Sequence, residues 1–557
     1  MKQSGAQIIV KLLERQGIEI IAGIPGGSNL PLYDALEESC IRHILTRHEQ
    51  GAGFLAQGMA RSTGRAAVCI ATSGPGATNL ITAIADARLD SIPLVAISGQ
   101  VPTTLIGTDA FQEVDMFGLT LPITKHNFFV ERAADLLHII PAAFRIAESG
   151  RPGPVAIDIP KDVQTALVDF DEWPEPGARQ TPGPCDPEII TRAAAMIRQV
   201  QRPILYIGGG IVAAGAATEL TALARKNSIP VALTLMGLGC FPPDDPLSLG
   251  MLGMHGARAT NFILEEADLL LAFGVRFDDR AIGRAREFCC HASIIHVDID
   301  EAEINKIRAS NLGCAADVGV FIRQLLPQID FVSRSEWTAR VRDLREKYPL
   351  QLPDRATLDH PAAIVRRISE QLPKDAIVTT DVGQHQMWTA QAYPVQQPRT
   401  LLTSGGLGTM GFGMPAAIGA ALANPDRKVV CISGDGSFMM NIQELATMAE
   451  HRVNVCVIIM NNNHLGLVRQ QQELFYNKRY AASRFLSSPD FAAIARGFGV
   501  KAYDLAHSDD PGATLLEAIS CPGPVLINAP VDQRANVFPM VPPGAANHEM
   551  IGGECYA

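Results

Sequence analysis

The sequence predicts an α/β fold of three doubly wound parallel-sheet domains, with the first and the third related to each other. Short runs of apolar, β-branched residues alternate with helical stretches along most of the chain, which is typical of parallel strands covered by helices on both faces. The 557 residues, 47% of them hydrophobic and 19% charged, suffice for several buried cores. An acidic, proline-rich stretch separates the first third of the chain from the rest.

The domain boundaries follow from the order of these strands and from the changes in composition between them. We predict an N-terminal domain, a linker, a central domain, a connecting segment, a C-terminal domain and a tail, over residues 1–165, 166–188, 189–330, 331–359, 360–530 and 531–557. The buried strands expected in them are Ile18–Ile24, Ala67–Ala71, Leu94–Ser98, Val155–Ile159, Ile204–Ile207, Leu269–Phe273, Ile294–Val297, Ile377–Asp381 and Val453–Met460. A charged helix is expected over 336–347 in the connecting segment.

Two similar strand–glycine–helix units link the first and third domains. The run Val68–Gly76 parallels Val430–Gly436. A helix of small residues precedes each run, at 51–60 and at 413–423, and another apolar strand follows each one. Convergence could produce this pattern, but the matching helix and strand on both sides favour two related sheets. A ligand would then lie at the carboxyl ends of their strands.

Charge, thiol use and the start of the chain restrict the class of protein. The formal net charge of −11 disfavours polyanions, so we expect no nucleic-acid partner. The 11 Cys are scattered without a C-x-x-C pair, as in proteins of a reducing compartment. The longest uncharged run, 400–425, contains six glycines and predicts a glycine-rich loop with a buried helix rather than a membrane span. With no signal-peptide pattern at the N-terminus, we expect a cytoplasmic protein without a membrane partner.

A carboxylate and an amide follow two neighbouring strands of the third domain. Gly434-Asp435-Gly436-Ser437 comes after one buried strand, and Asn461-Asn462 closes the next, 27 residues beyond Asp435. Parallel neighbours would present both oxygens at one sheet edge, and such hard ligands suit Mg²⁺ with a phosphate. The glycines allow backbone N–H groups to approach a diphosphate. A lone Gly-Asp-Gly is usually only a turn, but with the spaced Asn pair the pattern favours a diphosphate–magnesium site.

This spacing resembles the cofactor motif of thiamine-diphosphate enzymes, and the resemblance extends over almost the whole chain. Segments similar to acetohydroxyacid synthase (acetolactate synthase) large subunits are Ile24–Gly27, Arg47–Ala52, Gly99–Pro102, Gly107–Glu113, Phe277–Arg280 and Met540–Ala545. The resemblance implies a thiamine-diphosphate-binding fold with thiamine diphosphate, Mg²⁺ and FAD as cofactors. It implies decarboxylation of pyruvate and transfer of the hydroxyethyl unit to a second 2-oxo acid, the first common step of valine, leucine and isoleucine biosynthesis. It also implies a homodimer or larger assembly with a small regulatory subunit.

Four residues match catalytic positions of this family. Glu49 precedes a helix of small residues, and the resemblance implies that its carboxylate binds N1′ of the aminopyrimidine and makes the cofactor its own general base. The Gly27 N–H and the Gln112 amide are implied stabilisers of oxygen charge at the reacting carbonyl. Lys161 matches a lysine at the channel entrance. Gln112 could equally be a structural amide, and Lys161 a solvated surface cation.

The thiamine diphosphate contacts implied by the resemblance lie in the first and third domains. They are Glu49, Gly383, Gln384, His385, Gly408, Met410, Asp435, Gly436, Ser437, Asn462 and His464. Asp435, Asn462 and the backbone carbonyl of His464 match the Mg²⁺ ligands. For Met410, ordinary core packing is the simpler explanation from sequence alone.

The central domain resembles the FAD-binding domain of these synthases. The implied contacts are Arg151, Gly208, Gly209, Gly210, Leu252, Gly253, Met254, His255, Gly274, Arg276, Asp298, Ile299, Asp317 and Val318. Three glycines after a strand are usually just a loop, but here their amides are expected to meet a pyrophosphate, and Asp298 the adenosine part. Because the implied net reaction needs no oxidation, the flavin is expected to be structural.

Four residues match positions that select the substrate, namely Phe111, Arg280, Leu467 and Gln471. Arg280 is expected to guide carboxylates, or else is a solvated cation. Many relatives have Trp where this chain has Gln471, and that indole is thought to grip the ethyl group of 2-oxobutyrate. We therefore expect weak discrimination between pyruvate and 2-oxobutyrate as acceptors.

Three alternatives stay open at this point. An FAD-dependent pyruvate oxidase of the same fold would reduce its flavin, and Phe277–Arg280 disfavours it. A non-catalytic regulatory paralogue would not need Glu49, Asp435 and Asn462 together. A NAD-dependent dehydrogenase depends only on Gly406–Gly411, which fits G-x-G-x-x-G but follows a weak strand.

Overall fold

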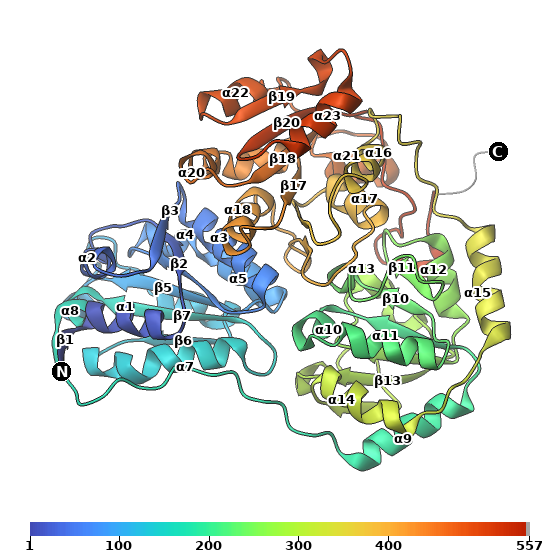
Figure 1. Cartoon of the computed structure of the whole chain (residues 1–557), viewed down its shortest axis with the longest axis horizontal. Coiled ribbons are helices and arrows are strands. Elements are labelled where there is room, and N and C mark those ends of the chain that lie inside the picture. Colours follow the sequence, from blue (N-terminus) through green and yellow to red (C-terminus); the bar gives the residue numbers. More distant parts are fainter. Residues whose placement is uncertain (553–557) are drawn as a thin grey trace.

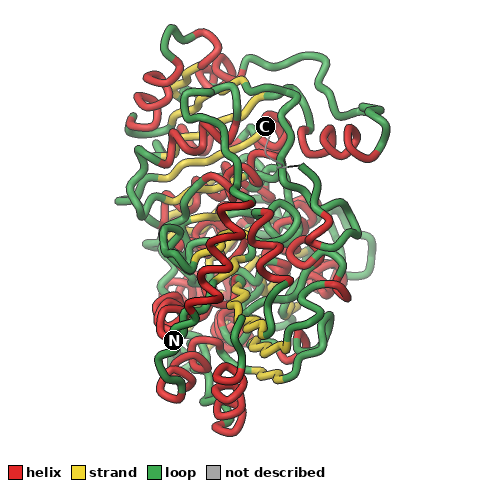
Figure 2. Tube along the Cα trace, turned by 90° about the vertical axis from the view of Figure 1, so that its right-hand side faces the viewer, coloured by secondary structure: helices red, strands yellow, loops and turns green. Residues whose placement is uncertain are grey.

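The computed structural model describes residues 1–552 and contains three parallel β-sheets of six strands each, flanked by helices (Figure 1). The blue-to-cyan, green-to-yellow and orange-to-red parts of Figure 1 hold the first, second and third sheet in chain order. In the view turned by 90°, strands lie between helices (Figure 2). The prediction of an α/β fold with three parallel sheets is confirmed.

The first sheet has the strand order β3-β2-β4-β5-β7-β6. Its strands are β2 (Ile20–Gly23), β3 (Arg42–Leu45), β4 (Ala67–Ala71), β5 (Leu94–Gln100), β6 (His126–Phe129) and β7 (Pro154–Pro160). The helices are α1 (Gly5–Arg15), α2 (Leu30–Glu37), α3 (Glu49–Thr63), α4 (Pro75–Asn79), α5 (Ile81–Leu89), α6 (Met116–Thr120), α7 (Leu136–Glu148) and α8 (Lys161–Thr165). α1 begins where the Ser4 hydroxyl accepts a hydrogen bond from the Gln7 N–H, and its apolar residues join the core under the sheet.

The second sheet has the order β11-β10-β9-β12-β13-β14, so its strands run 3-2-1-4-5-6 in chain order. They are β9 (Pro203–Ile207), β10 (Val231–Leu233), β11 (Ser248–Met251), β12 (Leu269–Phe273), β13 (Ser293–Asp298) and β14 (Leu312–Ala315). The helices are α9 (Pro187–Gln199), α10 (Gly209–Ala214), α11 (Ala217–Lys226), α12 (Arg258–Glu265), α13 (Asp279–Ile282), α14 (Val318–Leu325) and α15 (Ser335–Lys347). The order reverses between β9 and β12, and sheets of this order bind dinucleotides at the carboxyl ends of their strands at that point.

The third sheet has the order β16-β15-β17-β18-β20-β19. Its strands are β15 (Ile377–Thr380), β16 (Leu401–Leu402), β17 (Val429–Gly434), β18 (Val455–Asn461), β19 (Lys501–Asp504) and β20 (Val525–Pro530). The helices are α16 (Pro361–Ser369), α17 (Gln384–Ala392), α18 (Gly413–Ala423), α19 (Asp435–Phe438), α20 (Glu444–Glu450), α21 (Gly466–Phe475), α22 (Phe491–Gly497) and α23 (Pro511–Ser520). In chain order both outer sheets run 2-1-3-4-6-5, which supports the predicted relation between the first and third domains.

The two outer sheets meet through α3 and α18, the small-residue helices that precede β4 and β17 (Figure 1). A Cβ on Gly58 would lie 2.0 Å from the Ala416 carbonyl oxygen, and one on Gly419 would lie 1.9 Å from the Leu55 carbonyl oxygen. The helix backbones therefore touch directly, and no side chain fits between them. The two domains share one apolar core on both sides of this contact.

Several element ends differ from the expectation. β2 begins at Ile20 rather than Ile18, because the Ile18 N–H still donates to the Leu13 carbonyl at the end of α1. In the segment predicted as a linker, β8 (Leu167–Asp169) pairs antiparallel with β1 (Lys2–Ser4) and ties the start of that segment to the first domain.

The tail after β20 returns to the central domain. The Val541 N–H donates to the Met254 carbonyl, and Asn547 Nδ2 donates to the Ala281 carbonyl. The tail thus packs over the loops near α13.

The uncharged run 400–425 forms a loop and the buried helix α18, as predicted. Within residues 1–552, no helix combines the length and the apolar character that crossing a membrane requires.

Candidate active site

Asp435 and Asn462 lie at the same edge of the third sheet. β17 and β18 are parallel neighbours, and Gly434 pairs with Met460 at their carboxyl ends. Asp435 follows Gly434 directly, and Asn462 follows the last residue of β18. The strand arrangement therefore brings the predicted carboxylate and amide together.

Asp435 is buried, and its carboxylate is only partly satisfied by the protein. The Gly436 N–H donates to Oδ1 at 3.0 Å, while Oδ2 is buried without a hydrogen-bond partner among the described residues. Burial raises the pKa of this carboxyl to about 7, against the opposing effect of the backbone amides of Gly436, Asn463 and His464. A cation beside Oδ2 would favour the charged form, so the group fits a Mg²⁺ ligand.

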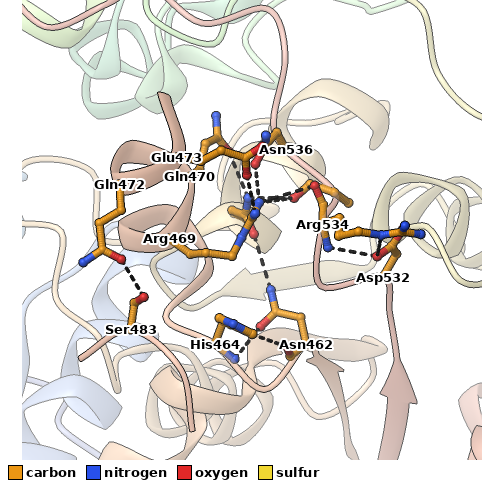
Figure 3. A network of polar contacts seen from close by, with 12 residues as sticks. Asn462, His464, Arg469, Gln470, Gln472, Glu473, Ser483, Asp532, Arg534 and Asn536 are labelled. Carbon is orange, nitrogen blue, oxygen red and sulfur yellow. Dashed lines mark hydrogen bonds and ion pairs between the residues drawn. The ribbon is translucent and has the colours of Figure 1, made fainter. Parts of the chain in front are cut away.

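The turn after β18 is held by its own polar groups (Figure 3). The His464 N–H donates to Asn462 Oδ1 at 3.1 Å, and His464 Nδ1 lies 2.8 Å from the Asn462 carbonyl oxygen. The imidazole thus bonds within its own turn. Within residues 1–552, no three His, Cys, Asp or Glu side chains converge as a metal-binding group, so a cation here would depend on one carboxylate with amide, carbonyl and phosphate oxygens.

The loop after β15 lies against the same edge. The His385 ring packs over Gly434, where a Cβ would lie 2.8 Å from Nδ1. Burial lowers the pKa of His385 to about 3, so the ring is neutral, and its buried Nε2 has no hydrogen-bond partner among the described residues. Gln384 Oε1 accepts from Asn462 Nδ2 at 3.4 Å, and the Ser437 hydroxyl donates to the Val382 carbonyl at 2.8 Å. The predicted diphosphate residues Gln384, His385, Gly436 and Ser437, with Gly383 at the N-cap of α17, therefore lie around the turns that carry Asp435 and Asn462.

The loop with Gly408 and Met410 is anchored by two aspartates that are not among the predicted site residues. Asp381, at the end of β15, accepts N–H bonds from Gly411 and Gly413 at 2.8 and 3.1 Å. Asp90, from the first domain, accepts N–H bonds from Gly405 and Gly406 at 3.0 and 2.7 Å. Apart from an acidic residue ending each element, no sequence signal marks these anchors.

In the first domain, Glu49, Gln112 and the Gly27 loop meet around the turn after β4. Gly76 in that turn lies beside Glu49, where a Cβ would be 3.3 Å from Oε1. Gly74 faces Gln112, which has a positive φ of 60°. Thr72 packs against Gly26 and accepts the Ser28 N–H at 3.3 Å.

The Glu49 carboxylate is buried and accepts a hydrogen bond from Asn79 Nδ2 at 2.9 Å. No hydrogen bond among the described residues joins the Glu49 carboxylate to Asp435, Asn462 or His464. Lys161, half-buried at the start of α8, lies at the same sheet edge but has no described side-chain bond to Glu49 or Gln112. Phe111 is 88% exposed and does not line the cavity that the other three selectivity residues share.

A cavity of about 660 Å³ lies at the point where the strand order of the central sheet reverses. All predicted FAD residues line it except Gly253, namely Arg151, Gly208, Gly209, Gly210, Leu252, Met254, His255, Gly274, Arg276, Asp298, Ile299, Asp317 and Val318. Ligand sites have this size and position, so the cavity fits a dinucleotide. Burial raises the pKa of Asp298 to about 6 and lowers that of His255 to about 4.

The N–H groups of two of the three consecutive glycines, Gly208–Gly210, already donate hydrogen bonds within the protein. The Gly208 N–H donates to Phe273, and the Gly210 N–H donates to the Gly274 carbonyl. A Cβ on Gly208 would lie 2.4 Å from that carbonyl oxygen. The glycines thus allow two loops to cross closely, and of these three amides only that of Gly209 remains as a candidate pyrophosphate donor.

One end of the cavity reaches residues from the third domain. Gly408, Leu467 and Gln471 line it together with Arg280, whose Nη1 lies 3.4 Å from Met254 Sδ. α21 is held by the neighbouring Gln470, whose Nε2 donates to the Val537 carbonyl. Three of the four predicted selectivity residues therefore share one wall.

Three family profiles match the chain in order. They are described as thiamine pyrophosphate enzyme N-terminal TPP binding domain, central domain and C-terminal TPP binding domain, over residues 3–119, 190–325 and 381–529. Thiamine pyrophosphate is another name for thiamine diphosphate. The matches fall on the three sheets described above.

The chain is also similar over its whole length to curated proteins. It is 56% identical over 550 residues to the acetolactate synthase isozyme 1 large subunit of Escherichia coli (strain K12), covering 99% of this chain and 98% of that protein. The isozyme 2 large subunit of the same strain is 45% identical over 548 residues, with 98% and 99% covered. The acetolactate synthase large subunit of Parasynechococcus marenigrum (strain WH8102) is 47% identical over 565 residues, with 99% and 91% covered.

Proposed function

The chain belongs to the family of acetolactate synthase large subunits within the thiamine pyrophosphate enzymes, and from this we propose that it decarboxylates pyruvate and transfers the two-carbon unit to a second 2-oxo acid. Pyruvate as acceptor gives 2-acetolactate, and 2-oxobutyrate gives 2-aceto-2-hydroxybutyrate. The observation that supports this most strongly is the 56% identity to an acetolactate synthase over 99% of the chain. In the branched-chain amino-acid pathway this is the first common step.

Thiamine diphosphate, when bound, supplies the electron sink that allows a 2-oxo acid to lose CO₂. Asp435, Asn462 and the His464 carbonyl would hold Mg²⁺, since Asp435 Oδ2 is buried and has no hydrogen-bond partner among residues 1–552. Glu49 would hold a proton at N1′ of the cofactor ring, which requires a carboxylate rather than an amide. The Gly27 N–H and the Gln112 amide would face the oxygen that gains charge.

FAD is proposed as a structural group in the cavity of the central domain. The 3-2-1-4-5-6 strand order and the lining residues support a dinucleotide there. Arg151 would fix one wall, because its Nη1 already pairs with Asp300 at 3.0 Å and Glu303 at 2.8 Å.

The product formed from pyruvate tests this function. With thiamine diphosphate, Mg²⁺ and FAD added, we expect acetolactate as the main product and a flavin absorbance spectrum that stays oxidised throughout turnover. Peroxide and acetyl phosphate formed at a comparable rate, with flavin reduction under anaerobic conditions, would instead favour the pyruvate oxidase alternative.

We also propose a homodimer or larger assembly, a small regulatory subunit as partner, and a cytoplasmic location. Exposed apolar side chains gather in the segment 105–121, at Leu105, Ile106, Phe111, Phe117, Leu119 and Leu121, and such patches mark interfaces. The ten described cysteines are all free thiols, as in reducing compartments. A monomeric mass in sedimentation equilibrium would contradict the assembly.

Acceptor selectivity is expected to depend on Gln471. The half-buried Gln471 lines the cavity beside Leu467, and its polar tip offers the extra methylene of 2-oxobutyrate little apolar contact. A methylene in an apolar pocket changes selectivity by about 10- to 200-fold. We therefore expect weak discrimination in the unmodified enzyme and a shift toward 2-oxobutyrate, at the lower end of that range, in Gln471→Trp.

A competition assay that measures both products from mixed acceptors checks this expectation. Val468→Trp is the matched control, because Val468 lies on the same helix but is 46% exposed and does not line the cavity. A strong preference for 2-oxobutyrate in the unmodified enzyme would show that another residue shapes the pocket.

A further inference from the structure

The two backbone amides that precede Glu49 are bound by a carboxylate from the other end of the chain. Glu444, the first residue of α20, is only 1% exposed. Its Oε1 accepts hydrogen bonds from the N–H groups of Arg47 and His48, both at 3.0 Å. His48 is the N-cap of α3, so Glu444 fixes the backbone at the point where the helix starts.

The second oxygen of the Glu444 carboxylate is also hydrogen-bonded, and the first lies close to the backbone of α3. Oε2 accepts from the Thr447 hydroxyl at 2.6 Å. A Cβ on Gly51, in the first turn of α3, would lie 2.5 Å from Oε1, so only glycine leaves room for the carboxylate. Burial raises the pKa of Glu444, while the hydrogen bonds from Thr447, Arg47 and His48 favour its charged form. The start of α3 also favours a negative charge through the helix dipole.

A second contact between the same segments differs in kind. The Arg47 side chain pairs with Glu450 at 2.5 Å, but the Glu450 side chain is 49% exposed. Exposed pairs of this type contribute at most about 1 kcal/mol. Glu450 therefore provides a matched control on the same helix, because its loss leaves no buried N–H group unpaired.

We propose that Glu444 is a positioning residue for the reaction: it holds the backbone of Arg47 and His48 and thereby sets the place of the Glu49 carboxylate. This inference rests on the proposed function of Glu49. Glu49 is the next residue in the chain, and its own side chain is held only by Asn79 among the described hydrogen bonds. Without Glu444, two partly buried N–H groups lose their acceptor, and the first turn of α3 is free to shift.

The expected effect is on turnover rather than on cofactor binding. A displacement of about 1 Å at a catalytic group lowers the rate by about 100-fold, so we expect Glu444→Ala to reduce kcat by about 10- to 100-fold. The affinity for thiamine diphosphate with Mg²⁺ should stay close to that of the unmodified enzyme, because the described hydrogen bonds of Glu444 go to Arg47, His48 and Thr447 and not to Asp435, Asn462 or His464. Glu444→Gln keeps one acceptor oxygen, so its kcat should lie between those of the unmodified enzyme and Glu444→Ala. Glu450→Ala should retain kcat.

A double-mutant cycle with Glu49→Gln separates positioning from a general structural role. If Glu444 acts through Glu49, Glu49→Gln/Glu444→Ala should turn over no more slowly than Glu49→Gln alone. Losses that multiply, or an Ala variant with normal kcat, would overturn the inference. If Glu444→Ala does not fold by circular dichroism, the same cycle is run with Glu444→Gln. An active Glu49→Gln single variant would instead refute the proposed role of Glu49 itself.

Discussion

Replacing Glu49 by glutamine is expected to lower kcat by about 100- to 10,000-fold, the range typical of losing a positioned general acid–base group. The amide has nearly the same shape and can still accept from Asn79 Nδ2, so the fold should be kept. It cannot, however, stabilise a proton on N1′ of the cofactor. The rate of acetolactate formation at saturating thiamine diphosphate is the measurement.

Two controls make this result specific. Glu37→Gln changes an exposed carboxylate in the same domain and should leave kcat unchanged. Exchange of the cofactor C2 proton, followed by NMR in D₂O, should slow in Glu49→Gln to the same extent as turnover. Near-normal exchange with slow turnover would place the role of Glu49 at a later step than cofactor activation.

Replacing Asp435 by alanine is expected to weaken binding of thiamine diphosphate with Mg²⁺ by at least about 10- to 100-fold. The change removes a charged ligand, and interactions with charged groups contribute about 1.5–3 kcal/mol each. It also removes a buried carboxylate whose Oδ2 has no hydrogen-bond partner among the described residues, so the protein without cofactor should not lose stability. Titration of the cofactor at fixed Mg²⁺ and thermal unfolding of the cofactor-free protein measure the two effects.

Asp509→Ala, at an exposed position of the same domain, serves as the matched control and should bind like the unmodified chain. Equal cofactor affinity in Asp435→Ala would remove Asp435 from the set of Mg²⁺ ligands. A loss of kcat at saturating cofactor without a loss of affinity would also contradict the assignment, because Asp435 would then act on the reaction rather than on binding.

Most inner strands of the three sheets could be predicted from the sequence because they are buried on both faces, although the prediction does not include the inner strands β10 and β20. Ala67–Ala71 and Leu269–Phe273 have the same bounds in the structure as in the prediction. The edge strands could not be predicted. β3 is Arg42-His43-Ile44-Leu45 with a single buried residue, and β16 has only two residues. Such segments form strands because they pair with a neighbouring strand, and their own composition does not distinguish them from loops.

The candidate site shows the same division. Asp435 and Asn462 could be placed together from the spacing of two neighbouring strands, because the carboxyl ends of parallel strands share an edge. The residues that position the site could not be found this way. Asp90 binds Gly405 across 315 residues, and Glu444 binds His48 across 396. These contacts depend on how the first and third domains dock, which no local pattern encodes.

The contact between α3 and α18 limits the ways in which the molecule can deform. At Gly58 and Gly419 the backbone of one helix lies against a carbonyl oxygen of the other. A shift of α3 along α18 by one residue would therefore place a side chain where there is room only for glycine. Closely packed helices of this kind have low compressibility and transmit strain. The two outer domains therefore cannot easily slide or rotate against each other at this contact. The freedom needed to admit a 2-oxo acid and release a larger product must therefore come from elsewhere. We expect that freedom in the segment after α21, where few contacts hold the chain because Tyr476 is exposed and Leu486 is 98% exposed.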